Sequence, residues 1–129
     1  MEYKGVKYFS TKVKYDFSAF HFNIIDVGVL IPDYLEIFKK CDTRVLCTSK
    51  PYELNALANV IELVGDIKIN CLVSFASEKD RKAIRETVKS DEIKTYFSRH
   101  SVDLFDGNMN RVIWSDILTE YIDDKELHV

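Results

Sequence analysis

An apolar run that ends in a single carboxylate, residues 22–28, constrains the fold of this chain more than any other feature. The run reads Phe-Asn-Ile-Ile-Asp-Val-Gly, with bulky and β-branched residues around Asp26. Short runs of this kind are typical of strands covered on both faces, which small domains mostly build into parallel sheets. Open α/β sheets place their ligand sites at the carboxyl ends of such strands. The run therefore predicts a buried central strand that presents Asp26 at the ligand-binding edge of a sheet.

Predicted strands and helices alternate along the rest of the chain. Apolar runs predict further strands at residues 44–48, 67–75 and 93–97. Apolar residues at helical spacing predict helices at residues 32–40, 51–64, 77–89 and 110–122. Because strands that alternate with helices form parallel sheets with right-handed crossovers, we expect a three-layer, Rossmann-like α/β domain with a mostly parallel central sheet.

The N-terminal residues follow a different pattern. Residues 3–9 and 11–17 alternate lysine with tyrosine, valine or phenylalanine, which is the period of half-exposed strands. They predict a β-hairpin or an edge ribbon beside the α/β core. The chain is long enough to bury one core, so we expect a single domain over all 129 residues. Its expected parts are N-terminal strands in residues 1–17, the α/β core in residues 20–122 and an acidic tail in residues 123–129.

Charge, hydropathy and cysteine content narrow the function classes. The net charge is -3, whereas nucleic-acid-binding modules normally carry a basic excess, so we expect no nucleic acid partner. No apolar run approaches the roughly 18 residues that span a bilayer, and no signal peptide begins the chain. The three cysteines are odd in number and lack CxxC spacing, which is typical of a reducing compartment and predicts a cytoplasmic protein.

The charges are distributed unevenly along the chain. Residues 1–14 hold four lysines against one glutamate, whereas the residues from His100 onward hold seven acidic residues against two basic ones. A solvated surface explains this pattern most simply. The alternative is an electrostatic contact between the basic N-terminal part and the acidic C-terminal part.

Asp26 is the leading candidate for a functional residue. Its carboxylate can hold a metal through water near a phosphate, or it can cap the turn after its strand. Thr48 and Ser49 lie between a predicted strand and a predicted helix, where they can offer hydroxyl and backbone N–H groups to an anion or form an ordinary N-cap. The chain holds neither GxxxxGK[ST] nor GxGxxG, and its three histidines lack metal-ligand spacing. The residues alone therefore supply no complete catalytic set.

The same segments resemble part of a known family, the MinD/ParA-like P-loop ATPases of the SIMIBI class. The matching segments are residues 22–28, 33–38, 41–42 and 44–48, with a looser likeness at residues 67–75 and 103–105. The resemblance covers residues 20–122 and corresponds to the C-terminal part of the family. It implies that Asp26 holds the position of the Walker-B-like carboxylate that orders water and magnesium. It also implies a bacterial cytoplasm as the setting.

The resemblance implies a chain without the family's phosphate-binding loop. That loop and its lysine lie upstream of the Walker-B strand, where this chain has only about 20 residues and no matching motif. We therefore expect a non-catalytic regulatory or protein-interaction domain that binds no cofactor by itself. The alternative is a nucleotide-binding ATPase fragment, which takes ATP and magnesium only when a partner supplies the missing P-loop half.

A second resemblance is to response-regulator receiver domains. It implies a phosphorylation switch, with Asp26 as the phosphoryl acceptor and Thr48 or Ser49 as the switch hydroxyl.

The MinD/ParA-like resemblance also has a consequence for association. In that family the phosphate-loop strand lies between the strands that correspond to residues 22–27 and 44–48. Without it, two apolar strands face a gap, which their direct pairing, insertion of residues 3–9 or a strand from a second copy would close. We therefore expect a homodimer or a complex with a P-loop-bearing partner.

Overall fold

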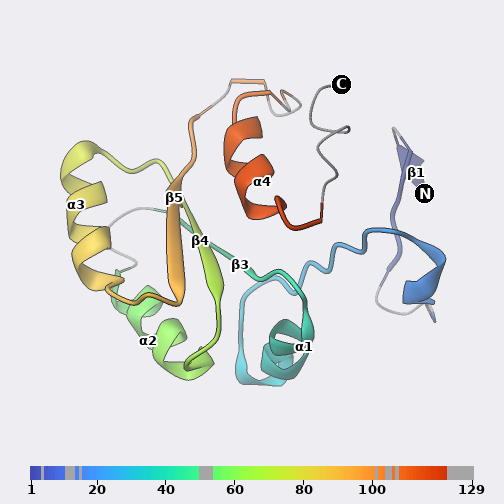
Figure 1. Ribbon diagram of the computed structural model, residues 1–129, viewed down its shortest axis with the longest axis horizontal. Helices are drawn as coiled ribbons and strands as arrows, with labels where there is room; N and C mark the ends of the chain where they lie inside the picture. The colour runs from blue at the N-terminus through green and yellow to red at the C-terminus, as the bar shows by residue number, and fades with distance from the viewer. Residues whose placement is uncertain are drawn as a thin grey trace.

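Three parallel strands form the sheet at the centre of the α/β part of the molecule (Figure 1). The computed structural model describes residues 1–3, 5–10, 14, 16–49, 54–100, 102–103, 106 and 108–121. The strands lie in the order β3 (Val45–Ser49), β4 (Ile69–Ser74) and β5 (Ile93–Phe97). Both neighbouring pairs are parallel. The strands predicted at residues 44–48, 67–75 and 93–97 are therefore confirmed, and the second of them is central.

Four α-helices accompany this sheet, close to the predicted positions. They are α1 (Leu35–Lys40), which follows the 3-10 helix η2 (Pro32–Tyr34), α2 (Leu54–Val64), α3 (Glu78–Thr87) and α4 (Arg111–Ile117). Gly65 follows α2 with a φ of +76°. This left-handed conformation commonly ends helices, and glycine adopts it without the steric cost that a Cβ atom adds. A capping box between Ser77 and Asp80 begins α3, with aspartate in the place that glutamate usually takes. α4 ends five residues before its predicted end at residue 122, which lies outside the described residues.

One face of the sheet is covered by helices. Alternate residues of β4 point to the same face, and there Cys71 and Val73 are fully buried. They lie in one apolar cluster with Leu57 of α2 and Ile84 of α3. A second cluster joins α1 to the other end of this face, with Phe38, Val64 and Ile69 as its buried members. α1, α2 and α3 thus pack on one side of the sheet, as parallel strands with same-handed crossovers require.

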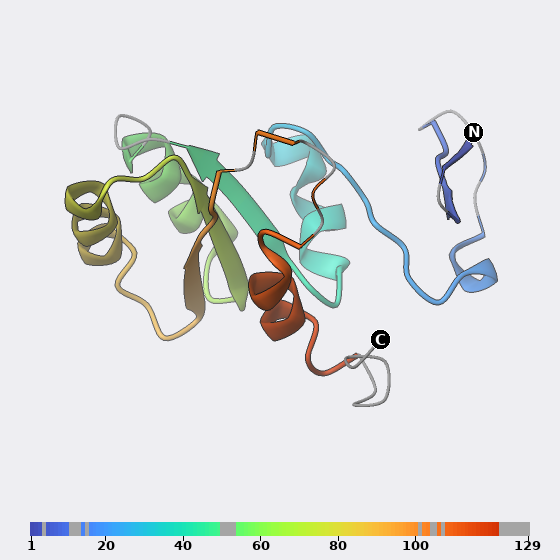
Figure 2. The same cartoon turned by 90° about the horizontal axis from the view of Figure 1, so that it is seen from above.

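The fourth helix lies on the opposite face. Lys94 and Tyr96 of β5 alternate with the residues that face α2 and α3, and both side chains bond to Asp116 of α4. Cys47 of β3 lies on this same face and is exposed. Figure 2 shows α4 beside β5, away from α2 and α3. The molecule is an α/β fold with a parallel sheet, compatible with a Rossmann-like architecture, and α4 covers its second face only in part.

The prediction of a buried central strand at residues 22–27 is wrong. These residues form no strand, and the side chain of Ile24 is 92% exposed. They belong to a segment that holds no α-helix or strand, residues 16–27, which we call the arm. A turn ends the arm, in which Gly28 has a φ of +64° and donates its N–H to Asp26. An apolar run becomes a strand only where a neighbouring strand satisfies its backbone groups, and this segment has no such ladder in the structure.

The N-terminal residues form a hairpin that is shorter than predicted. β1 (Glu2–Tyr3) and β2 (Val6–Lys7) pair antiparallel, so the hairpin, apart from Glu2, lies inside the segment expected to be its first strand. The second expected strand, residues 11–17, lies partly outside the described residues, and its last residue begins the 3-10 helix η1 (Phe17–Ala19). Both views show this hairpin apart from the three-stranded sheet, at the end of the arm (Figures 1 and 2). The expected hairpin exists, but it does not extend the central sheet.

In the part of the chain that the structure describes, no helix combines the length and apolar character needed to cross a membrane. The acidic tail predicted at residues 123–129 lies outside the described residues.

Candidate functional site

Asp26 lies in the turn that ends the arm, rather than at the end of a buried strand. Its Oδ1 atom accepts the backbone N–H of Gly28 at 2.9 Å, so the carboxylate stabilises this turn. The side chain also acts on β3, because its negative charge adds to the effect of burial in raising the pKa of the Cys47 thiol. Burial is the larger cause. The structure therefore brings Asp26 near the exposed face of β3.

Thr48 and Ser49 end β3 at the carboxyl edge of the sheet, as predicted. Both are half-buried, and they lie opposite Val73 and Ser74 of β4. Cys47, which the charge of Asp26 reaches, directly precedes them. The predicted N-cap role of Thr48 and Ser49 concerns the start of the following helix. Residues 50–53 lie outside the described part of the chain, so this role stays a prediction.

These residues do not fit a magnesium–nucleotide complex by themselves. A single carboxylate supplies at most one ligand, and that of Asp26 is already bonded to a backbone N–H. Over the described residues, no three His, Cys, Asp or Glu side chains form a group able to hold a metal ion. A phosphate-binding loop with its lysine would have to come from another chain or from sequence that is not present here.

The carboxyl ends of β4 and β5 carry a polar pair that the sequence analysis missed. The hydroxyls of Ser74 and Ser98 lie 2.8 Å apart. Phe75 directly follows β4 with a φ of +59°, a left-handed conformation that is an outlier for a bulky residue. Its ring lies against that of His100, with 5.3 Å between their centroids. The sequence signal for this arrangement is weak: Ser74 lies near the end of one predicted strand, and Ser98 directly follows the next.

A second missed cluster joins β5 to α4. Asp116 Oδ2 accepts Lys94 Nζ at 2.6 Å and the Tyr96 hydroxyl at 2.5 Å. These donors hold the pKa of the Asp116 carboxyl below its ordinary value, and the carboxylate in turn raises the pKa of Lys94. Burial, followed by the bond to Asp116, raises the pKa of Tyr96. Because all three groups satisfy one another, the cluster fixes a helix on the sheet and offers no free acid or base.

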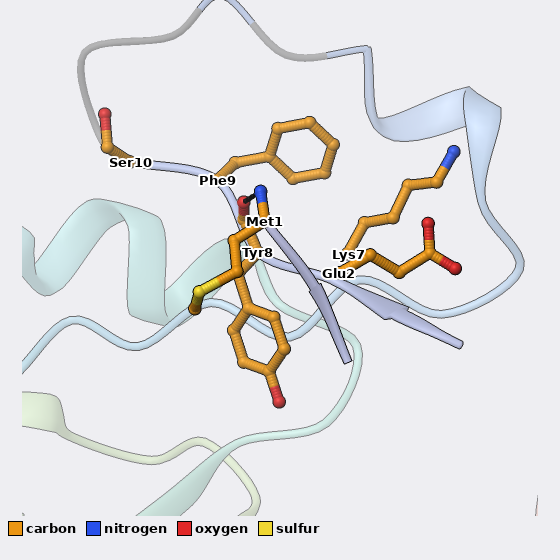
Figure 3. A pocket seen from close by; sticks show the side chains of 6 residues that line it. All are labelled: Met1, Glu2, Lys7, Tyr8, Phe9 and Ser10. Carbon is orange, nitrogen blue, oxygen red and sulfur yellow. Dashed lines mark hydrogen bonds between the residues drawn. The ribbon is translucent and has the colours of Figure 1, made fainter. Parts of the chain in front are cut away.

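Two hollows in the described part of the chain are lined by none of Asp26, Thr48 and Ser49. The larger, about 460 Å³, is formed by the N-terminal hairpin and the residues just after it (Figure 3). Its lining residues are Met1, Glu2, Lys7, Tyr8, Phe9 and Ser10. The smaller, about 310 Å³, lies between the end of β5 and α4. Glu2 and Lys7 are the only charged side chains among the lining residues of the larger hollow, so that hollow does not resemble a catalytic pocket.

Comparisons of the chain with protein-family models, curated proteins and solved structures gave no significant match. The function is therefore argued from the site itself.

The most unusual surface of the molecule is apolar and lies on the arm. The side chains of Phe17, Phe22 and Ile24 are each more than half exposed, at 55%, 52% and 92%. Ile25 is also exposed. Exposed apolar side chains that gather on one segment are candidates for an interaction site. The sequence patterns predicted Phe22, Ile24 and Ile25 in a buried strand and Phe17 at the end of a half-exposed strand, so they did not predict the surface that these side chains form.

Proposed function

We propose that this chain is a non-catalytic regulatory or protein-interaction domain, related to the C-terminal half of MinD/ParA-like P-loop ATPases. A single observation carries the proposal: the segment that the resemblance makes a core strand, residues 22–27, lies exposed as an apolar arm. A strand-forming segment outside a sheet is stabilised when a partner supplies the missing neighbour. The α/β core then serves to hold this segment and the adjoining strand β3 in place for the partner.

The residues that the resemblance assigns to nucleotide chemistry support this choice over an ATPase. Phosphoryl transfer depends on positioning and on neutralising charge with a phosphate loop, a lysine and a metal ion. Asp26 alone provides none of these, and its carboxylate stabilises a turn in the exposed arm. We propose that the partner is a second copy or a P-loop-bearing chain, in the cytoplasm of a bacterium, and that the complete sheet has three-layer, Rossmann-like architecture.

Calorimetric titration with ATP and magnesium tests the non-catalytic role. We expect no heat of binding at micromolar to millimolar nucleotide, for the full chain and for Asp26→Asn alike. Asp91→Asn serves as the matched control, because it removes a carboxylate from an exposed turn just before β5. Micromolar, magnesium-dependent binding that disappears in Asp26→Asn but persists in Asp91→Asn would reject the proposal in favour of the ATPase fragment.

A further inference from the structure

The smaller hollow lies at the carboxyl end of β5 and has the size of a small-ligand site. We call it the β5–α4 hollow, and its volume is about 310 Å³. Pockets that hold small molecules measure roughly 300–1,000 Å³, so it lies at the lower end of that range. It is lined by the end of β5 and the start of α4, which lie side by side in both views (Figures 1 and 2). Open α/β sheets place their ligand sites just outside the carboxyl ends of strands.

The lining of this hollow combines apolar side chains with one positive charge. The lining residues are Phe97, Arg99, Met109, Asn110, Val112 and Ile113. Arg99 is the charged residue among these six, none of them is acidic, and all except Arg99 and Asn110 are apolar. Small-molecule sites are mostly apolar, with a few polar groups that fix the orientation of the ligand. The lining therefore fits a ligand with an apolar body and one negative charge.

The backbone of Arg99 is fixed at the hollow by another lining residue. Asn110 Oδ1 accepts the N–H of Arg99 at 2.8 Å, and Asn110 Nδ2 donates to its carbonyl at 3.2 Å. Over the described residues, the guanidinium of Arg99 forms no hydrogen bond or ion pair. A guanidinium presents its N–H groups in a planar fork that matches the two oxygens of a carboxylate. Arg99 thus has an anchored main chain and a fork with unused donors.

Two further guanidiniums lie against Phe97, which lines the hollow. The Cζ atoms of Arg81 and Arg85, one turn apart on α3, lie 5.2 Å and 5.0 Å from the centroid of its ring. Arg81 pairs with Glu78 at 3.3 Å, whereas Arg85 forms no ion pair over the described residues. Together with Arg99, three positive charges and one negative charge gather around Phe97, in a chain with a net charge of -3. This local excess of positive charge favours an anion at the hollow.

We propose that the β5–α4 hollow binds a small organic carboxylate with an apolar body. The Arg99 guanidinium donates to the carboxylate, and the apolar part of the ligand lies against Phe97, Met109 and Ile113. Because these groups come from β5 and from the start of α4, the bound ligand joins the helix to the sheet on the face that α4 covers only in part. This inference goes beyond the proposed interaction function and does not depend on it.

Titration of the full chain with octanoate, followed by amide NMR shifts, tests this site. Octanol has the same apolar chain without the charge, and inorganic phosphate has negative charge without the chain. We expect octanoate to bind with a dissociation constant below about 1 mM, and octanol and phosphate to bind about tenfold more weakly or not at all. The largest shifts with octanoate should fall on residues 97–99 and 109–113, which surround the hollow.

Two variants separate the charge of the site from its apolar lining. Arg99→Gln removes the guanidinium and should weaken octanoate binding about tenfold, whereas Lys82→Gln, at an exposed position of α3, should leave it unchanged. Val112→Glu places a carboxylate at the hollow, on a side chain that is 83% exposed, so it should compete for Arg99 without disturbing the fold. Val102→Glu makes the same change at a side chain that is 94% exposed and does not line the hollow, and it should have no effect.

Four results would overturn the proposal. Octanoate that shifts no amide up to roughly 10 mM would show that the hollow is no ligand site. Equal binding of octanol, or binding that survives both Arg99→Gln and Val112→Glu, would show that the carboxylate is not recognised. Equal binding of inorganic phosphate would show that the apolar lining plays no part. Shifts confined to the N-terminal hairpin or the arm would place binding elsewhere. None of these results bears on ATP and magnesium, so the non-catalytic role is tested separately.

Discussion

Asp116 and Lys94 form an ion pair with 2.6 Å between Oδ2 and Nζ, and it joins α4 to β5 across the second face of the sheet. The same carboxylate oxygen accepts the hydroxyl of Tyr96. The two donors come from alternate residues of one strand, so both side chains point to the same face. Both partners of the ion pair are substantially exposed, and its role is to position α4 rather than to supply much stability.

Replacing Asp116 should loosen α4 in a pH-dependent way. Lys94 and Tyr96 hold the pKa of the Asp116 carboxyl below its ordinary value, so its contribution to folding is present at neutral pH and lost as pH falls through the folded-state pKa. Urea unfolding of the wild type and of Asp116→Asn should therefore differ at pH 7, and the difference should shrink as the pH falls below about 4, the ordinary pKa of an aspartate. A difference that persists unchanged at pH 3 would show that the carboxylate charge plays no part.

The connection between β5 and α4 depends on Asn110. Its side-chain amide exchanges two hydrogen bonds with the main chain of Arg99, one from Arg99 N–H at 2.8 Å and one to its carbonyl at 3.2 Å. Asn110→Ala should lower the free energy of unfolding by about 1 kcal/mol, because the exposed main chain of Arg99 loses both of its hydrogen bonds to the amide. Asn108→Ala, at an exposed position two residues earlier, should change it by less than about 0.5 kcal/mol. Chemical denaturation of both variants checks the difference.

Sequence patterns predicted the sheet because its central strand is covered on both faces. In β4, alternate residues from Ile69 to Val73 are buried against helices, and the intervening residues are half-buried. Residues 22–27 have a similar composition but form no strand. The amino-acid composition of a segment shows that it is able to form a strand. Whether a partner strand lies beside it depends on residues far away in the sequence, which a local pattern does not show.

The short hairpin and the missed clusters have related causes. The lysine–aromatic alternation of residues 3–9 fits one long strand as well as two short ones, and only the φ of +77° at Gly5 marks the reversal. The hydroxyl pair of Ser74 and Ser98 joins residues 24 positions apart. Thr48 and Ser49 end β3 as predicted, whereas Asp26 lies in a turn of the arm instead of at the end of a buried strand, and the functional roles of all three remain predictions.

Phe75 should show the energetic cost of its backbone conformation. Asparagine tolerates the left-handed region better than other non-glycine residues, whereas β-branched residues are outliers there. The Phe75 side chain is 61% exposed, so its loss should cost little burial. We expect Phe75→Asn to leave the free energy of unfolding unchanged or raise it by up to about 1 kcal/mol, and Phe75→Val to lower it by about 1 kcal/mol. Equal stability of the two variants would contradict strain at this position.

The reactivity of Cys47 should report the position of Asp26. Burial and the charge of Asp26 together raise the pKa of the Cys47 thiol, so Asp26→Asn should lower that pKa and increase the thiolate fraction at fixed pH. At pH 8 we expect alkylation of Cys47 by iodoacetamide to become roughly twofold faster. Peptide mass spectrometry at timed intervals measures each cysteine separately.

Two other thiols serve as internal references in the same samples. Cys71 is fully buried, with a pKa raised to about 11, so it should react only when the chain unfolds. Cys41 lies at the end of α1, and its alkylation rate should be unchanged in Asp26→Asn. As a second control, Asp33→Asn should leave the alkylation rate of Cys47 unchanged. If Asp26→Asn left Cys47 unchanged, the turn of the arm would lie away from β3 in solution.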